Sequence, residues 1–314
     1  MMMHRLPVHE QIPLLVKANE IARRYEMWDR LARISLRLGR ALQDAGQDRK
    51  AARYINDFLR LSRKVGDPAL LKATSHSLSE YFGFKGKFLE ATRSYEQMVG
   101  DREEFGDDEE VLMASQFVGF SHAYCGRISR GLGMIDAVRI KAELLNFPSV
   151  VHYCDQASTI VLLTIRRIPE AEFYVNRLAS FSDEELGPVL AWALCDHKAF
   201  ILCSREDYEG AFALVKEGVE HSRASGRTHN HYAWNFETLA TLESKGYFCE
   251  EMNLDSLIQR ALSLDDIHLK GVALRYRALR NMDARHPRSR ILADLVNSEK
   301  LLKRSGAEID ISCD

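Results

Sequence analysis

Apolar side chains recur at helical spacing along almost the whole chain, separated by short polar turns. The clearest example is the stretch RLGRALQDAGQDRKAARYINDF, from Arg37 to Phe58. It predicts two short amphipathic helices with a turn at Gly46, because apolar residues three and four positions apart share one helix face. No stretch shows the alternation of apolar and polar residues that is typical of strands. The pattern therefore predicts an all-α protein.

Small residues recur along this pattern with a period of 40 residues. In the first helix of each unit they are Gly39, Ser79, Gly119, Thr159 and Ala199, and in the second they are Ala51, Ala91, Gly131, Ala171 and Ala211. An apolar residue follows each second-helix position, at Ile55, Tyr95, Ile135, Val175 and Val215. Two helices that cross closely have no room for a larger side chain at the crossing point. A fixed period of this kind predicts a stack of helix pairs, in which each pair buries its apolar face against its neighbours.

The predicted organisation is an N-terminal segment with a capping helix (1–27), a repeat array (28–306) and a short tail (307–314). The expected pairs are 28–45 with 48–65, 68–85 with 87–105, 108–125 with 128–145, 148–165 with 169–180, 184–203 with 207–224, 228–244 with 249–263, and 265–283 with 287–304. Residues 1–11 are expected to be frayed. The first helix has no partner before it, which either a natural cap or excision from a longer protein would explain. The periodic signal weakens in the sixth pair, and the seventh, near Leu279, shows only the helical period.

The turn residues carry a resemblance to a known repeat. Gly86-Lys-Phe88, Gly126-Arg-Ile and Glu206-Asp-Tyr208 stand where the tetratricopeptide repeat has Gly-Asn/Asp-Tyr. The usual period of that family is about 34 residues. The 40-residue version is similar to the repeat domains of large bacterial signal-transduction and transcriptional regulators. The resemblance implies a right-handed superhelix of about seven helix pairs. It also implies a sensor or scaffold region that binds a protein or peptide.

Composition and charge are those of an ordinary soluble chain. The net charge is −2 and 46 % of the residues are hydrophobic. No apolar run is long enough for a membrane span, and the N-terminus has no signal-peptide core, so a cytoplasmic protein with free thiols is expected. Basic residues are in excess before Gly66 and in the last fifty residues, whereas the run 101–110 is acidic.

The first helices of such pairs line a concave groove, so their exposed positions predict a binding site. The expected groove residues are His76, Gln116, Phe117, Phe120, Gln156, Asp196, His197, Phe200, Phe236 and Glu237. The aromatic rings would supply contact area and the polar groups would orient an extended peptide. A merely solvated concave face is the alternative interpretation.

Other functional classes find little support in the sequence. The groove lacks the Lys/Asn/Arg set of a carboxylate clamp, and no basic stretch is interleaved with aromatic residues, so direct nucleic-acid binding is not expected. Cys195 and His197 are two positions apart on a helix and point to different faces, and no Cys-x-x-Cys or His-Glu-x-x-His motif occurs, so no metal or cofactor is expected. No nucleophile or phosphate-binding motif supports an enzyme.

The sequence therefore predicts a non-catalytic module that binds a protein or peptide in its concave groove. Two alternatives remain open. One is a scaffold that self-associates through the ends of the array, suggested by the unpaired first helix. The other is a sensor for a small-molecule inducer, suggested by the four phenylalanines of the groove.

Overall fold

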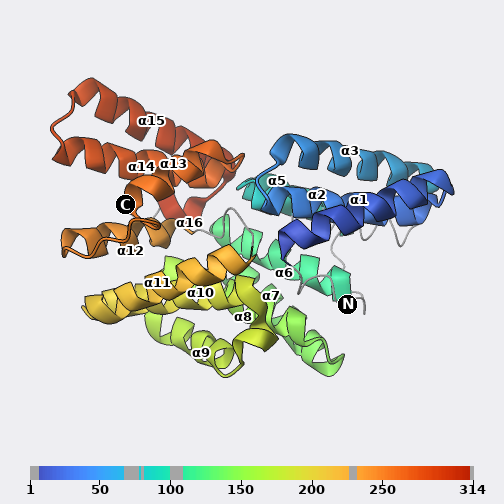
Figure 1. Ribbon diagram of the computed structural model, residues 1–314, viewed down its shortest axis with the longest axis horizontal. Helices are drawn as coiled ribbons and strands as arrows, with labels where there is room; N and C mark the ends of the chain where they lie inside the picture. Colours follow the sequence, from blue (N-terminus) through green and yellow to red (C-terminus); the bar gives the residue numbers. More distant parts are fainter. Residues whose placement is uncertain (1–6, 67–77, 79–80, 100–108, 226–231, 312–314) are drawn as a thin grey trace.

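The computed structural model describes residues 7–66, 78, 81–99, 109–225 and 232–311. Within these ranges every regular element is a helix, and most consecutive helices pack as antiparallel pairs (Figure 1). In chain order they are α1 (Val8–Arg24), α2 (Trp28–Asp44), α3 (Asp48–Val65), α5 (Phe88–Val99), α6 (Glu109–Tyr124), α7 (Ile128–Leu144), α8 (Pro148–Thr164), α9 (Ile168–Ala179), α10 (Asp183–Ser204), α11 (Tyr208–Ser225), α12 (Ala233–Ser244), α13 (Leu254–Ser263), α14 (Ile267–Asp283), α15 (Arg288–Ser305) and α16 (Glu308–Ile311). The all-α helical-repeat class predicted from the sequence is confirmed.

A residue with positive φ follows most helices, at intervals close to 20 residues. Glycine takes this position at 46, 66, 86, 126, 246 and 306, and Glu26, Asn146, Arg166, Glu206 and Arg285 take it elsewhere. A left-handed residue at the end of a helix lets the following amide groups bond the last free carbonyls. Two such stops in each unit produce the 40-residue period, and the non-glycine stops explain why the turn signal is uneven along the sequence.

Close contacts between paired helices lie at the small residues. A Cβ atom added to Gly39 would lie 2.7 Å from Cδ1 of Ile55, and one added to Gly119 would lie 2.8 Å from Cγ1 of Ile135. Ala171 is completely buried at the equivalent crossing. The predicted reason for the small residues is thus confirmed where the structure describes them; Ser79 lies outside the described residues.

The last repeats depart from the predicted register. Leu279 stands where the period predicts the crossing, but it is 47 % exposed. The close approach instead occurs at Gly271, where an added Cβ would lie 2.9 Å from Leu302 and where Ser298 Oγ donates to the Gly271 carbonyl at 2.6 Å. The crossing of α14 and α15 is therefore shifted toward the start of α14.

Helix starts differ from prediction where local capping decides them. The helix expected to begin at Cys249 begins instead at Leu254, because Asn253 Oδ1 accepts from the Ser256 amide at 2.8 Å and caps it.

Val8 is buried in α1, so the expectation that residues up to 11 are frayed is wrong for the described part of that segment.

The array curves back on itself. The Ile267 amide donates to the Lys85 carbonyl at 3.0 Å, and Lys85 Nζ lies 2.7 Å from Asp265 Oδ2. The Asp265 amide also donates to Asp48 Oδ2 at 3.2 Å. The start of α14 therefore meets the turn before α5, and Figure 1 shows the last helices beside α5 and α6. We call this contact the closure.

Candidate functional site

The structure buries five of the ten predicted groove residues between neighbouring helices. Gln116, Gln156, His197, Phe200 and Phe236 are buried, while Phe117, Phe120, Asp196 and Glu237 are partly exposed. His76 lies outside the described residues. The expectation of an open aromatic and polar groove is therefore wrong for the buried residues, because the next first-type helix covers the positions that were expected to face solvent.

The predicted residues from α8, α10 and α12 nevertheless meet at one place. Gln156 Nε2 donates to Tyr232 Oη at 3.1 Å, and the Tyr232 ring stacks on Trp234 with 5.2 Å between centroids. The Trp234 ring lies 5.3 Å from His197 and 5.5 Å from Phe200. We call this meeting of the three helices the seam.

Two polar groups in the seam have no hydrogen-bond partner among the described residues. They are both ring nitrogens of His197 and the indole Nε1 of Trp234. Burial lowers the pKa of His197 to about 3, so its ring is neutral at physiological pH. Buried polar groups without partners cost free energy, and in native proteins each one calls for an explanation. The neutral imidazole costs less to bury than the charged form would.

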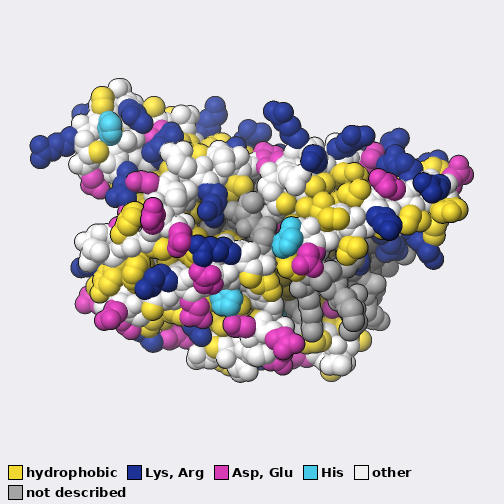
Figure 2. Space-filling view, in the orientation of Figure 1, with side chains coloured by type: hydrophobic (Ala, Val, Ile, Leu, Met, Phe, Trp, Pro, Cys, Tyr) yellow, Lys and Arg dark blue, Asp and Glu magenta, His cyan; other side chains and the backbone are white. Residues whose placement is uncertain are grey.

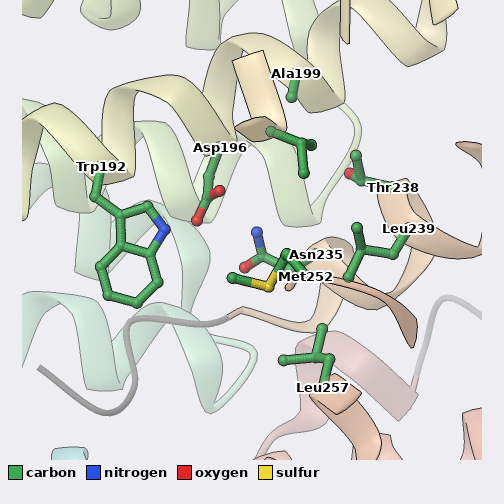
Figure 3. Close-up of a pocket in the computed structure, with 9 residues that line it drawn as sticks. Trp192, Asp196, Ala199, Asn235, Thr238, Leu239, Met252 and Leu257 are labelled. Atoms are coloured by element: carbon green, nitrogen blue, oxygen red, sulfur yellow. The ribbon is translucent and has the colours of Figure 1, made fainter. Parts of the chain in front are cut away.

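A small cavity lies beside the seam (Figure 3). Asp196 and Asn235 point into it from α10 and α12, and Trp192, Met252 and Leu257 are among its other lining residues. Burial raises the pKa of Asp196 to about 8, although a hydrogen bond with Asn235 opposes the shift. The cavity has a volume of about 10 Å³, at the limit of what one water molecule needs. Its size does not support an inducer site there.

A segment of the chain itself covers the inner face of α6. Phe88 and Phe120 each lie 4.5 Å from the Tyr124 ring, and His268 lies 5.4 Å from it. Ala307 and Ile309 are buried against this cluster. The ring of Phe120, which the sequence placed in the groove, is thus packed against this cluster.

A wider pocket opens beside the closure. It measures about 420 Å³, and Arg127, Lys303 and Glu308 are among its lining residues. Both cations already have carboxylate partners, since Arg127 Nη1 lies 2.7 Å from Glu96 and Lys303 pairs with Glu299. Because these ion pairs neutralise both cations, the pocket offers little positive charge to an anionic ligand.

The thiols that lie near these sites are not activated. Burial raises the pKa of Cys125 and of Cys203 to about 11, so both are protonated at neutral pH. The thiolate is the nucleophilic form of cysteine. The interpretation of the chain as non-catalytic stays a prediction, and these two groups give no argument against it.

Exposed apolar side chains gather on the last helix pair. They are Leu279 and Met282 on α14 with Leu292, Leu295 and Val296 on α15, each between 37 and 62 % exposed. Basic side chains accompany them: Figure 2 shows Lys and Arg over α14–α15 and over α1–α3. We call these five residues the α14–α15 face. This face was not predicted from the sequence, although the helical spacing of Leu292, Leu295 and Val296 indicates one apolar stripe.

One helix, α10, is long and apolar enough to cross a membrane by length and composition, among the parts of the chain that the structure describes. However, 61 % of its apolar window is buried inside the stack. Core helices of soluble proteins share these properties, so α10 is weak evidence for a membrane span.

Comparison with known proteins supports the fold class. No protein-family model and no curated protein matches the chain. Among solved structures, BtubC (BKLC) from P. vanneervenii is similar with a TM-score of 0.50 and 16 % identity, over 72 % of this chain and 94 % of BtubC. At this identity the likeness concerns the fold alone. The chain is therefore an all-α helical-repeat protein.

Proposed function

We propose that this chain is a non-catalytic protein-binding module and that its partner contacts the α14–α15 face. The observation that carries the proposal is the exposure of the five apolar side chains on this one helix pair. Large exposed apolar patches are uncommon on soluble proteins and mark contact surfaces. The closure and the seam already occupy much of the groove in which the sequence placed a partner, so this face is the more accessible surface.

The charge around the face indicates the chemistry of the partner. Helix α15 carries Arg288, Arg290, Lys300, Lys303 and Arg304 against two acidic residues, Asp294 and Glu299. Asp294 is neutralised within the fold, because Arg277 donates to both of its oxygens. A protein segment with apolar anchors and acidic flanks would complement this surface.

The tetratricopeptide-like turn residues support a wider role. We place the module in the sensor or scaffold region of a cytoplasmic bacterial signalling or transcriptional regulator. In such a region, partner binding would change the pitch of the array, since each repeat touches only its neighbours and small changes add along the stack.

The test is affinity capture from cells of the source organism with three baits. One is the unchanged chain, one carries Leu292→Glu with Val296→Glu, and the control carries Leu144→Glu, which alters an apolar residue that is 82 % exposed on α7. We expect a protein that the unchanged chain and the control retain and the double variant loses. Equal retention by all three baits would rule out the α14–α15 face as the contact surface.

Self-association is a second candidate, favoured by a second apolar stripe at the other end of the array. Leu14 and Ile21 are exposed on α1, and Tyr25 is exposed directly after it. Both ends carry a basic excess, so head-to-tail contact would strengthen as salt screens the repulsion. Sedimentation velocity at low and high salt tests this: a monomer in both conditions excludes a self-associating scaffold.

A further inference from the structure

A group of side chains of the types that bind metals lies on α10 and α11, and neither the seam nor the α14–α15 face includes it. Cys195 on α10 and Glu217 and His221 on α11 each offer one ligand atom, and these three atoms lie within 4.8 Å of one another. Glu217 and His221 are four positions apart and therefore share one helix face. That face is turned toward the helix that carries Cys195.

A fourth candidate ligand, Asp183, lies next to His221 at the edge of this group. Oδ2 of Asp183 lies 3.6 Å from Nε2 of His221, and Oε1 of Glu217 lies 3.9 Å from the same nitrogen. Both distances are too long for a hydrogen bond. Zinc bonds of about 2.0–2.3 Å in tetrahedral geometry place two ligand atoms roughly 3.3–3.7 Å apart. These two separations come close to these values. The side chains of Asp183 and Glu217 are exposed, so both can turn toward Cys195 to complete the set.

The surrounding packing holds the ligands on rigid elements. A Cβ atom added to Gly218 would lie 3.4 Å from Cβ of Cys195 and equally close to the Trp192 ring, so α10 and α11 are already in close contact beside the cluster. Cys195 is buried, and the imidazole of His221 is mostly covered. Sites built on packed helices hold ligand geometry better than sites on loops.

The electrostatics of the cluster favour a cation. Burial raises the pKa of Cys195 to about 12, and the carboxylates of Glu217, Asp196 and Asp183 contribute to the shift, against one cation, Lys198. The thiol is protonated in this negative environment. A divalent ion would reverse the balance, because metal binding releases the thiol proton and pairs the carboxylates with positive charge.

We propose that Cys195, Glu217 and His221 bind one Zn²⁺ ion, with Asp183 as the fourth ligand. Sulfur, imidazole and carboxylate are the ligand types that zinc takes in proteins. The ion would act as a structural staple. Asp183 belongs to the first turn of α10, which is separated from the rest of that helix by Gly187 at φ 73° and ψ 164°. Zinc would tie this turn to α11 across the kink.

The test uses the full chain after treatment with a chelator, titrated with Co²⁺ alone. We expect the near-ultraviolet absorption of a thiolate–cobalt bond, at one ion per chain, and its displacement by Zn²⁺. Cys195→Ser should abolish this absorption. Cys203→Ser, on the same helix but outside the cluster, should keep it. No absorption in the unchanged chain, or equal absorption in Cys195→Ser, would overturn the proposal.

A second measurement protects against a variant that fails to fold. Zn²⁺ should raise the melting temperature of the unchanged chain and of Cys203→Ser, and it should leave His221→Gln unchanged. Far-ultraviolet circular dichroism confirms that His221→Gln, at a partly exposed position, keeps its helices. A zinc-induced rise of the same size in His221→Gln would contradict the assignment of this ligand.

Discussion

His268 Nε2 lies 2.6 Å from Oδ2 of Asp310, and the two side chains are only 5 and 6 % exposed. Burial lowers the pKa of His268, but the charge of Asp310, its hydrogen bond and the charge of Asp266 together outweigh burial, so the pKa lies above its ordinary value. Below this pKa the imidazole is protonated and donates to the carboxylate. Since His268 lies in the first turn of α14 and Asp310 belongs to α16, this buried ion pair fastens the closure at the point where both segments meet the aromatic cluster of α5 and α6.

The stability of the chain should therefore fall as the pH rises past neutrality. A histidine with a raised folded pKa contributes stability that is complete below the unfolded value of about 6.5 and is lost as the pH passes the folded value. Asp310→Asn should lower the free energy of unfolding by roughly 3 kcal/mol at pH 6 and flatten this part of the pH profile. Urea unfolding from pH 5.5 to 9 measures both effects. An unchanged slope in the variant would show that another group causes the pH dependence.

Asp196 gives a prediction in a lower pH window. Its folded pKa of about 8 lies above the ordinary 3.8, so the folded chain holds a proton that the unfolded chain releases. Stability should fall as the pH rises from about 4 to about 8. Asp196→Asn keeps the shape and removes the charge, so its melting temperature should exceed that of the unchanged chain at pH 8 by more than at pH 4. Thermal unfolding at both values checks this, and an equal difference would mean that the carboxyl is solvated.

Two glycines in α7 form a matched pair for the helix crossing. A Cβ on Gly131 would lie 2.5 Å from the carbonyl oxygen of Gly119, a backbone atom that cannot turn away, whereas nothing lies within 4 Å of one on Gly133. Gly131→Ala should destabilise the fold by about 1–3 kcal/mol. Gly133→Ala should be neutral or stabilise it by about 0.5–1 kcal/mol, because alanine is the better helix former. Denaturant unfolding of both variants measures the contrast, and equal effects would contradict this crossing.

A second glycine pair tests the closure. Gly86 has φ +61°, and an added Cβ would lie 2.3 Å from Oδ1 of Asp266 and 2.6 Å from the His268 amide. Gly246 has a similar φ of +88° but open space around it. Alanine adopts the left-handed conformation less readily than glycine, so both variants carry this cost. Any further destabilisation of the Gly86 variant therefore comes from the contact at the closure.

Gly86→Ala should accelerate hydrogen exchange at the Ile267 amide, which bonds the Lys85 carbonyl. Gly246→Ala should leave that amide protected. If both variants exchange it at the rate of the unchanged chain, the contact between Lys85 and α14 does not control the opening of this end.

The sequence by itself determined the helices and their pairing. Apolar spacing of three and four places each helix, and a small residue every 40 positions marks each crossing, because both patterns depend on neighbours that are close in the chain. The prediction was wrong where a capping residue or the packing of the last repeat determined the structure. Asn253 determines where α13 begins, and the last crossing lies at Gly271 and not at Leu279.

Only the tertiary structure decided which surfaces remain open. The apolar period predicts which face of each helix points inward. Small rotations between neighbouring repeats add up along the array, and the total rotation cannot be predicted from the sequence of a single repeat. That sum brings Ile267 to Lys85 and covers His197 and Phe236, which the sequence placed in a groove. The tertiary structure also brings Cys195 close to His221 on the next helix. From the sequence, only His197 on the same helix was considered as a partner for Cys195.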